Sequence, residues 1–255
     1  MKTSLALFTL TLSLPLLCAC SSNDKGQPRR PLTVEVSEPS VGRADSLRIF
    51  QMNYGNNQYI VEKEGGTWGS LTWPSGVGDE QKIDIYAYNS GTFHYNEGTP
   101  YITFTADELL RSQKDLCVAT HKQIAYSDTD GAVSLRFSHV CAMVKVRVKS
   151  VSEETITVNK VTLRHVKKQG NYHYNSTPHW TDISNEGDYT LTTADIVLGN
   201  SYQQLPCGYI YMIPQRKDGI MLGINYTVGG TSKTKMFALT GEWQEGKEDE
   251  VLVEM

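Results

Sequence analysis

Residues 143–149 read MVKVRVK, and this stretch is the clearest secondary-structure signal in the chain. Three valines alternate with three cationic residues. The valines are Val144, Val146 and Val148, and the cations are Lys145, Arg147 and Lys149. A period of two places the valines on one face of a strand and the charges on the other. The pattern is typical of a sheet that covers a core on one side and faces water on the other.

Similar short runs, separated by turns rich in Gly, Asn, Asp and Ser, fill the chain from residue 32 onward. They predict strands over 32–36, 47–52, 59–61, 71–73, 83–88, 101–104, 133–137, 143–148, 156–163, 209–213, 220–228, 235–239 and 251–253. Asp130-Gly131 and Gly229-Gly230 are expected to be hairpin turns. The apolar parity switches within 156–163, which predicts a β-bulge near Asn159-Lys160. Residues 209–213 are apolar on both faces and are expected to form a central strand.

Helix signals are scarce. Thr105 and Glu108 form a capping-box pattern that predicts at most two helical turns over Thr105–Leu110. Many closely spaced strands with one or two short helices predict an all-β fold built from β-sandwiches. The length suits two sandwich domains, 32–150 and 151–255, divided at the charged, Ser-rich turn Ser150–Glu154.

The N-terminus reads MKTSLALFTLTLSLPLLCAC. One cation precedes an apolar run too short to span a bilayer, so residues 1–19 are expected to be a signal peptide rather than a core strand or a membrane anchor. Leu17-Cys18-Ala19-Cys20 resembles a bacterial lipobox, in which the thiol after a small residue takes a diacylglycerol and the freed amine an acyl chain such as palmitate. We expect Cys20, rather than Cys18, to be lipidated. Residues 20–31 then form a lipidated, flexible tether.

Three further cysteines, Cys117, Cys141 and Cys207, leave their disulfide state open: one disulfide with one thiol, or none. Their neighbours are largely apolar, which favours small buried residues. The six histidines are scattered without metal-ligand spacing, and no nucleophile, phosphate-loop or dinucleotide motif is present. A net charge of −4 opposes nucleic-acid binding. We therefore expect no enzyme, no metal, no cofactor and no nucleic-acid partner.

Five segments, taken in order, resemble landmarks of the fimbrillin family of Bacteroidetes. They are KIDIYAY at 82–88, QKDLCVA at 113–119, FSHVCAMVKV at 137–146, YMIPQ at 211–215 and WQEGK at 243–247. The last strand departs from the family's usual aromatic pattern and carries Glu248-Asp249-Glu250 instead.

This resemblance implies two tandem transthyretin-like β-sandwich domains in a lipoprotein anchored to the cell outer membrane, exposed at the surface and assembled into a fimbrium. Its expected partners are other fimbrial subunits and the membrane lipid, with host or bacterial surface ligands as further candidates. Family members polymerise after a protease removes an N-terminal strand, and a strand from the next subunit then fills the groove. His139 and Ala142 become packing residues of a strand.

Candidate sites follow from this reading. Arg43 and Arg48 lie where a trypsin-like protease could release the strand at 32–36, and the terminal strand containing Val251, Leu252 and Val253 is the candidate donor. A closing role for both strands within their own sandwiches stays open. Ser46, in Asp45-Ser46-Leu47, resembles a Bacteroidetes O-glycosylation site.

A non-polymerising, glycan-binding surface lipoprotein is the alternative. Trp68, Trp73, Trp180 and the many tyrosines could form an aromatic platform for sugars, or they could pack in the cores.

Overall fold

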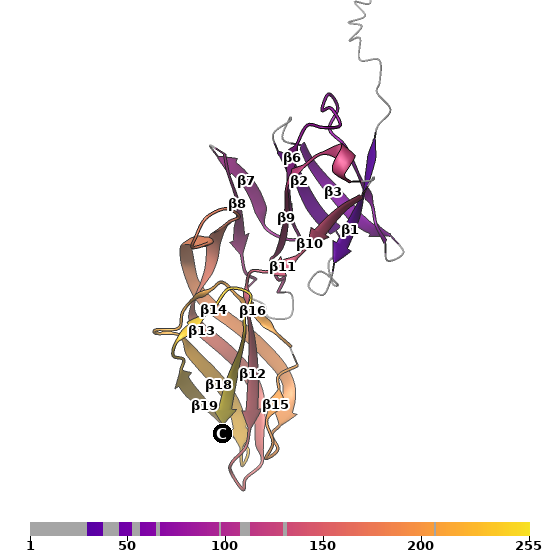
Figure 1. Ribbon diagram of the computed structural model, residues 1–255. Helices are drawn as coiled ribbons and strands as arrows, with labels where there is room; N and C mark the ends of the chain where they lie inside the picture. The colour runs from indigo at the N-terminus through magenta and orange to yellow at the C-terminus, as the bar shows by residue number, and fades with distance from the viewer. Residues whose placement is uncertain are drawn as a thin grey trace, which may run out of the picture.

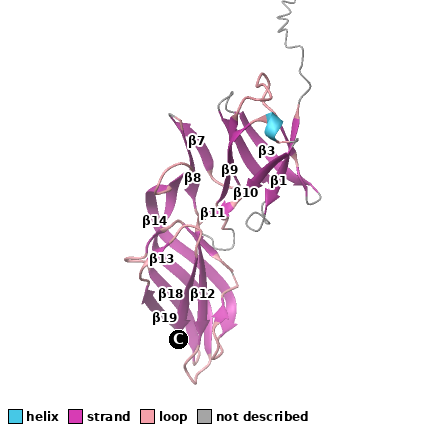
Figure 2. Cartoon of the chain, in the orientation of Figure 1, coloured by secondary structure: helices cyan, strands magenta, loops and turns pink. Residues whose placement is uncertain are grey.

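The computed structural model describes residues 30–37, 46–52, 57–64, 67–96, 98–107, 113–129, 132–206 and 208–255. Strands dominate these residues, and the helical structure among them is the single 3-10 turn η1 (Tyr126–Asp128) (Figure 2). The all-β prediction is confirmed. Thr105 ends a strand, and 108–112 lie outside the described residues together with the Asp130-Gly131 turn. None of the described helices is long and apolar enough to cross a membrane.

The smaller of two hydrophobic cores lies between two sheets in the first part of the chain (Figure 1). A three-stranded sheet has the order β10-β1-β5 and a longer one the order β11-β9-β6-β2-β3-β4. Their strands are β1 (Pro31–Ser37), β2 (Ser46–Met52), β3 (Asn57–Glu64), β4 (Thr67–Trp68), β5 (Ser70–Thr72), β6 (Ile83–Tyr88), β9 (Cys117–Ile124), β10 (Ala132–Arg136) and β11 (Ser138–His139).

The larger core is built mainly from the second part of the chain. One sheet consists of β12 (Ala142–Lys149), β15 (Gln203–Gln204), β16 (Ile210–Met212) and β21 (Glu248–Glu254). The facing sheet consists of β7 (Thr92–Asn96), β8 (Thr99–Thr105), β13 (Ile156–His173), β14 (Trp180–Val197), β18 (Met221–Val228) and β19 (Thr231–Ala238). The remaining two strands, β17 (Gln215–Arg216) and β20 (Glu242–Trp243), form a small antiparallel sheet.

The strand at 143–149 behaves as its pattern predicts. Val144, Val146 and Val148 are buried in the larger core, and the intervening cations lie on the opposite face of β12. The predicted bulge is confirmed by a register shift between Val158 and Lys160 in both pairings of β13. Gly229 and Gly230 turn β18 into β19 with positive φ, as the hairpin prediction requires.

One strand prediction is wrong. Residues 209–213 were expected to form a central strand, but within the described residues β16 pairs with β12 alone. Its apolar character has another cause: Ile210, Met212 and Ile213 are all buried in the larger core. In a central strand the backbone N–H of Tyr211 would donate to a carbonyl of a second neighbouring strand. It donates instead to Gln113 Oε1 at 3.0 Å.

The predicted domain boundary at Ser150–Glu154 stays a prediction. Strand β12 precedes it, yet β12 pairs with β15, β16 and β21, which all follow it. The β7–β8 hairpin also joins the second part of the chain, because β8 pairs with the end of β13. From this pairing we propose a division between β11 and β12.

Candidate functional site

The last strand, β21, lies at an edge of the larger sandwich. It runs parallel to β12 over seven residue pairs, and β12 is its one strand partner within the described residues. Val253 and Met255 point inward and are buried, Val251 is half-buried, and Leu252 on the outer face is 50% exposed. The strand therefore closes its own sandwich with one apolar face, and its other edge has no strand partner among the described residues.

The outer face of β21 meets the cations of β12 in a ladder of ion pairs. Lys145 bonds Glu248 at 2.7 Å, Arg147 bonds Glu250 at 3.1 Å, and Lys149 bonds Glu254 at 2.7 Å; we call these the charge ladder. The ammonium groups of Lys145 and Lys149 hold the pKa of Glu248 and Glu254, respectively, below its ordinary range. Because each pair joins fixed positions of two strands, the ladder specifies the register of β21.

Two tyrosines from the β15–β16 side extend the ladder. Tyr209 donates its hydroxyl to Glu248 at 2.7 Å, and Tyr202 donates to Glu254 at 3.1 Å. Lys145 and Lys149 lie over the rings of these tyrosines, 4.7 and 4.6 Å from the ring centroids. In the acidic run 248–250, which departs from the family pattern, Glu248 and Glu250 thus have partners on the neighbouring strand, and Asp249 accepts from Lys217 Nζ at 2.8 Å.

The first strand, β1, occupies an interior position. It is parallel to β10 on one side and antiparallel to β5 on the other, and Leu32 and Val34 are buried in the smaller core. Arg30 fixes its start: the guanidinium donates to the carbonyl of Val77 at 2.5 Å and pairs with Asp79. Loss of β1 would therefore expose two unpaired strand edges and a strip of apolar core.

β1 and β21 share one pattern. Leu32-Thr33-Val34-Glu35-Val36 and Val251-Leu252-Val253-Glu254-Met255 both place three apolar side chains inward at every second residue, and both carry Glu at the fourth position. Both strands also run parallel to their longest-paired neighbour, β10 or β12. In its alternation of apolar and polar side chains and in its parallel direction, β21 resembles β1.

The remaining sequence-predicted residues lie near the N-terminus. Cys20, Arg43 and Asp45 fall outside the described residues. Ser46 is the first residue of β2 and is paired with Glu62 of β3. Arg48 lies within β2, where the backbone is paired with β3 and with β6. A protease binds its substrate as an unpaired extended segment, so a paired Arg48 is a poor cleavage site in the folded chain.

The tryptophans proposed as a sugar platform are core residues. Trp68, Trp73 and Trp180 are all buried, and the indole N–H groups of Trp73 and Trp180 donate to the carbonyls of Val77 and Val140. These three tryptophans therefore do not form a stacking platform, and the glycan-binding alternative is left with the tyrosines alone.

Four of the five family-like segments converge where the two cores meet, at the entrance to β12. The N–H of Val140 donates to Leu116 O at 3.0 Å, Gly246 N–H to Cys141 O at 3.1 Å, and Met143 N–H to Lys247 O at 2.9 Å. Gln113 bonds Tyr211, as described above. The segments at 113–119, 137–146, 211–215 and 243–247 thus form one junction.

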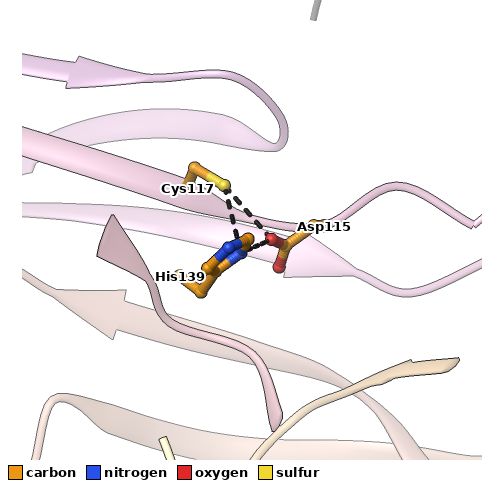
Figure 3. A group of neighbouring side chains, drawn as sticks. All are labelled: Asp115, Cys117 and His139. Carbon is orange, nitrogen blue, oxygen red and sulfur yellow. Dashed lines mark hydrogen bonds and ion pairs between the residues drawn. The ribbon is translucent and has the colours of Figure 1, made fainter. Parts of the chain in front are cut away.

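A polar cluster of Asp115, Cys117 and His139 lies at this junction (Figure 3). The pairing of β9 with β11 sets Cys117 opposite His139. Asp115 Oδ2 contacts His139 Nδ1 and lies 3.2 Å from Cys117 Sγ, while Sγ and Nδ1 are 3.7 Å apart. The hydrogen bond to Asp115 raises the pKa of His139, against the opposing effect of burial.

The geometry of this cluster argues against nucleophilic catalysis. In a catalytic triad the imidazole bridges nucleophile and carboxylate through its two different nitrogens. Here the thiol and the carboxylate both face Nδ1, so His139 cannot pass a proton from one to the other. The sequence predicts Cys117 and His139 as separate packing residues, because the strand register that brings them together with Asp115 is not visible in their spacing.

The comparisons with known proteins agree with this architecture. The family model described as fimbrillin-like matches residues 42–255. A candidate cell adhesion protein from Bacteroides uniformis is 16% identical with a TM-score of 0.56, covering 90% of this chain and 94% of its own. A second, from Bacteroides ovatus, is 15% identical with a TM-score of 0.56, covering 89% and 93%. No curated protein sequence matches significantly.

At these identities the solved structures establish a shared fold. The family match spans most of the chain, from just before β2 through the terminal strand, and includes every segment of the junction. The chain therefore belongs to the fimbrillin-like family.

Proposed function

We propose that this chain is a surface lipoprotein that serves as a fimbrial subunit or a fimbria-associated adhesin, and that subunits join by strand donation. In this proposal β1 is removed from one subunit, and β21 of another takes its place. The role is structural and adhesive and needs no catalysis. Its partners are other fimbrial subunits and, through Cys20, the lipid of the outer membrane.

The shared pattern of β1 and β21 carries the proposal. With β21 in the place of β1, Val251, Val253 and Met255 take the positions of Leu32, Val34 and Val36. The register of β1 then sets Leu252 opposite Ala132 and Glu254 opposite Ser134, on the outer face. Main-chain hydrogen bonds supply affinity and the alternating side chains supply specificity, as in other strand additions.

Release of β1 requires a cut between β1 and β2. Of the two predicted sites, we propose Arg43 rather than Arg48, because Arg48 lies in a strand that is paired on both sides. Cleavage there would remove the tether of residues 20–31 along with β1. The cut subunit would therefore leave its lipid anchor when it joins a fimbria.

Before assembly, Cys20 would hold the chain at the membrane. Several acyl chains on one residue give stable anchoring where a single chain is marginal. Cys20→Ser should abolish incorporation of labelled fatty acid in the native host, and Cys18→Ser should leave it unchanged. The reverse pattern would assign the anchor to Cys18.

A peptide-binding experiment tests the exchange directly. A site-specific protease sequence replaces residues 38–45 in the full chain, purified in mild detergent, so that one cut frees β1. A fluorescent peptide of residues 248–255 should bind the cut chain after β1 has been washed away, and should not bind the uncut chain, in anisotropy measurements.

Two peptide variants provide matched controls. Val253→Asp places a charge on the inward face and should abolish binding, since an unpaired buried carboxylate is strongly disfavoured. Leu252→Ala changes the outer face and should bind nearly as well as the parent. Equal binding of the peptide to cut and uncut protein would contradict strand donation, and so would equal affinity of the parent and Val253→Asp peptides for the cut protein.

A further inference from the structure

We propose that Asp115, Cys117 and His139 form a binding site for a borderline-soft divalent cation, for which zinc is the best match. The proposal does not depend on strand donation. It rests on the convergence of three different ligand atoms, on a buried carboxylate oxygen with no partner, and on a rigid framework behind the ligands.

The donor set suits zinc. Thiolate, imidazole and carboxylate are the side chains that bind it, and a mixed set of sulfur, nitrogen and oxygen disfavours calcium and magnesium, which take oxygen ligands. Ligands at tetrahedral zinc distances lie about 3.5 Å from one another. Cys117 Sγ is 3.2 Å from Asp115 Oδ2 and 3.7 Å from His139 Nδ1. A small rotation of the His139 side chain away from Asp115 would admit the ion among the three atoms.

Asp115 is the unusual member of the cluster. Its side chain is 8% exposed, and its Oδ1 is buried without a hydrogen-bond partner. A buried carboxylate oxygen is normally satisfied by a donor or by a cation. The contact with His139 serves Oδ2 alone, so a metal ion held by both oxygens of this carboxylate would also satisfy Oδ1.

The backbone behind the ligands is held in place by Asn89. Its Oδ1 accepts from the N–H of Cys117 at 2.8 Å, and its Nδ2 donates to the carbonyl of Asp115 at 3.0 Å. The pairing of Cys117 with His139 across β9 and β11 fixes the third ligand. Support of this kind, one step behind the ligands, is typical of protein metal sites.

Access and a fourth ligand are also available. The His139 side chain is 26% exposed, so the ion can enter from solvent past its ring. The Cys141 thiol is buried beside the same Asp115 carboxylate but does not join the three ligand atoms that lie within 4.8 Å of one another, so water is the candidate fourth ligand. Strands β9 and β11 are joined by only two residue pairs. The bound ion would add a further link between them at the entrance to β12.

Metal titration of the intact protein tests the site. The full chain, reduced and stripped with a chelator, is titrated with zinc alone by calorimetry and with cobalt(II) by absorbance. We expect one ion per chain with a Kd below about 1 μM. Cobalt should give a thiolate charge-transfer band and the visible bands of a tetrahedral complex.

Variants assign the ligands. Cys117→Ser and His139→Gln should each weaken zinc binding by about 100-fold or more, and Cys117→Ser should remove the charge-transfer band. The matched control is His165→Gln: His165 also bonds a carboxylate through Nδ1, that of Glu186 at 2.8 Å, but no thiol joins that pair in the described residues. This control should bind as the parent does. Far-UV circular dichroism checks that every variant is folded.

Three results would overturn the proposal. Cobalt could give no thiolate band in the reduced parent protein. Cys117→Ser and the parent could bind zinc alike while both are folded. Protein taken from its native host could carry a Cys117–Cys141 disulfide, detected by mass spectrometry, which would leave no thiolate for the ion.

Discussion

The first and last strands of the described chain are alike in sequence pattern and differ in what holds them. β1 is bonded to strands on both sides and buries Leu32 and Val34, and the described residues show no ion pair on its outer face. β21 has one strand partner and is also held by the charge ladder. Burial and main-chain pairing hold both strands, and the difference lies in what is added: a second strand neighbour for β1, and paired side chains for β21.

This difference suits the roles proposed for the two strands. A groove that forms when β1 leaves retains its apolar lining and two open edges, so any strand with the β1 pattern can fill it. The ladder that holds β21 in its own sheet consists of exposed ion pairs, which contribute little stability each and weaken with salt. Acid or salt can therefore weaken one part of what holds β21, while its pairing with β12 and its buried Val253 and Met255 remain.

The largest expected contrast is between the two leucines of these strands. Leu32→Ala should lower the free energy of unfolding of the smaller core by about 2–5 kcal/mol, because it removes a fully buried side chain. Leu252→Ala, on the exposed face of β21, should cost about 0.5 kcal/mol or less. Urea denaturation of both variants measures the difference, and equal costs would show that β1 is not a core strand.

A second contrast concerns the turn that leads into β21. Gly246 has φ +63°, and a Cβ there would lie 2.8 Å from the carbonyl oxygen of His139. Gly241 has φ +86° with nothing within 4 Å of such an atom.

Gly241→Ala should therefore cost about 1 kcal/mol for its backbone conformation alone. Gly246→Ala should cost about 2–3 kcal/mol, since the clash with backbone adds to the same strain. Thermal unfolding of the two variants compares them. A smaller loss of stability at Gly246 than at Gly241 would mean that the backbone near His139 shifts to relieve the clash. The junction would then not set the position of β21.

Acid should loosen β21 and leave unchanged residues 33–37 of β1, which lie beyond the Arg30–Asp79 ion pair. The bonds from Lys145 and Lys149 lower the pKa of Glu248 and Glu254 below the ordinary value of 4.5. A lowered pKa in the folded state stabilises β21 above pH 4.5, and this stabilisation is lost as pH falls through the folded-state pKa.

Amide exchange protection, corrected for the intrinsic effect of pH, should thus fall in β21 on acidification and stay constant in residues 33–37 of β1. A charge reversal, Lys149→Glu, should produce the same loosening at neutral pH. Parallel loss of protection in both strands would indicate that acid opens the whole chain rather than the ladder.

Much of this fold could be predicted because period-two patterns report which face of a strand is buried. β12 and the bulge near Lys160 are examples. The long hairpin of β13 and β14 could not, since its strands bend through bulges and positive-φ residues such as His165, Asp182 and Asn185, and polar side chains cover most of its outer face. Alternation also cannot identify partners, so the parallel pairing of β1 with β10 was not foreseen.

The candidate sites divide in the same way, into those with a local sequence pattern and those that depend on strand pairing. Val251 to Val253 could be proposed from the sequence as a donor strand because its pattern is local. The cluster of Asp115, Cys117 and His139 depends on the register between β9 and β11, which is a property of the folded sheet. The two halves of the charge ladder are visible in the sequence as KVRVK at 145–149 and EDEVLVE at 248–254. Only the pairing of β12 with β21 shows that these charges face one another.

Cross-linking between subunits tests the central claim, that β21 of one chain replaces β1 of another. In the uncut chain Leu252 lies opposite Arg147, so the pair Leu252→Cys and Arg147→Cys should cross-link within one chain. After β1 is cut away, a subunit with Leu252→Cys mixed with a subunit with Ala132→Cys should give a covalent dimer, because the register of β1 sets Ala132 opposite the donated position 252. Full retention of the internal cross-link after the cut, with no Leu252–Ala132 dimer at any concentration, would contradict strand donation.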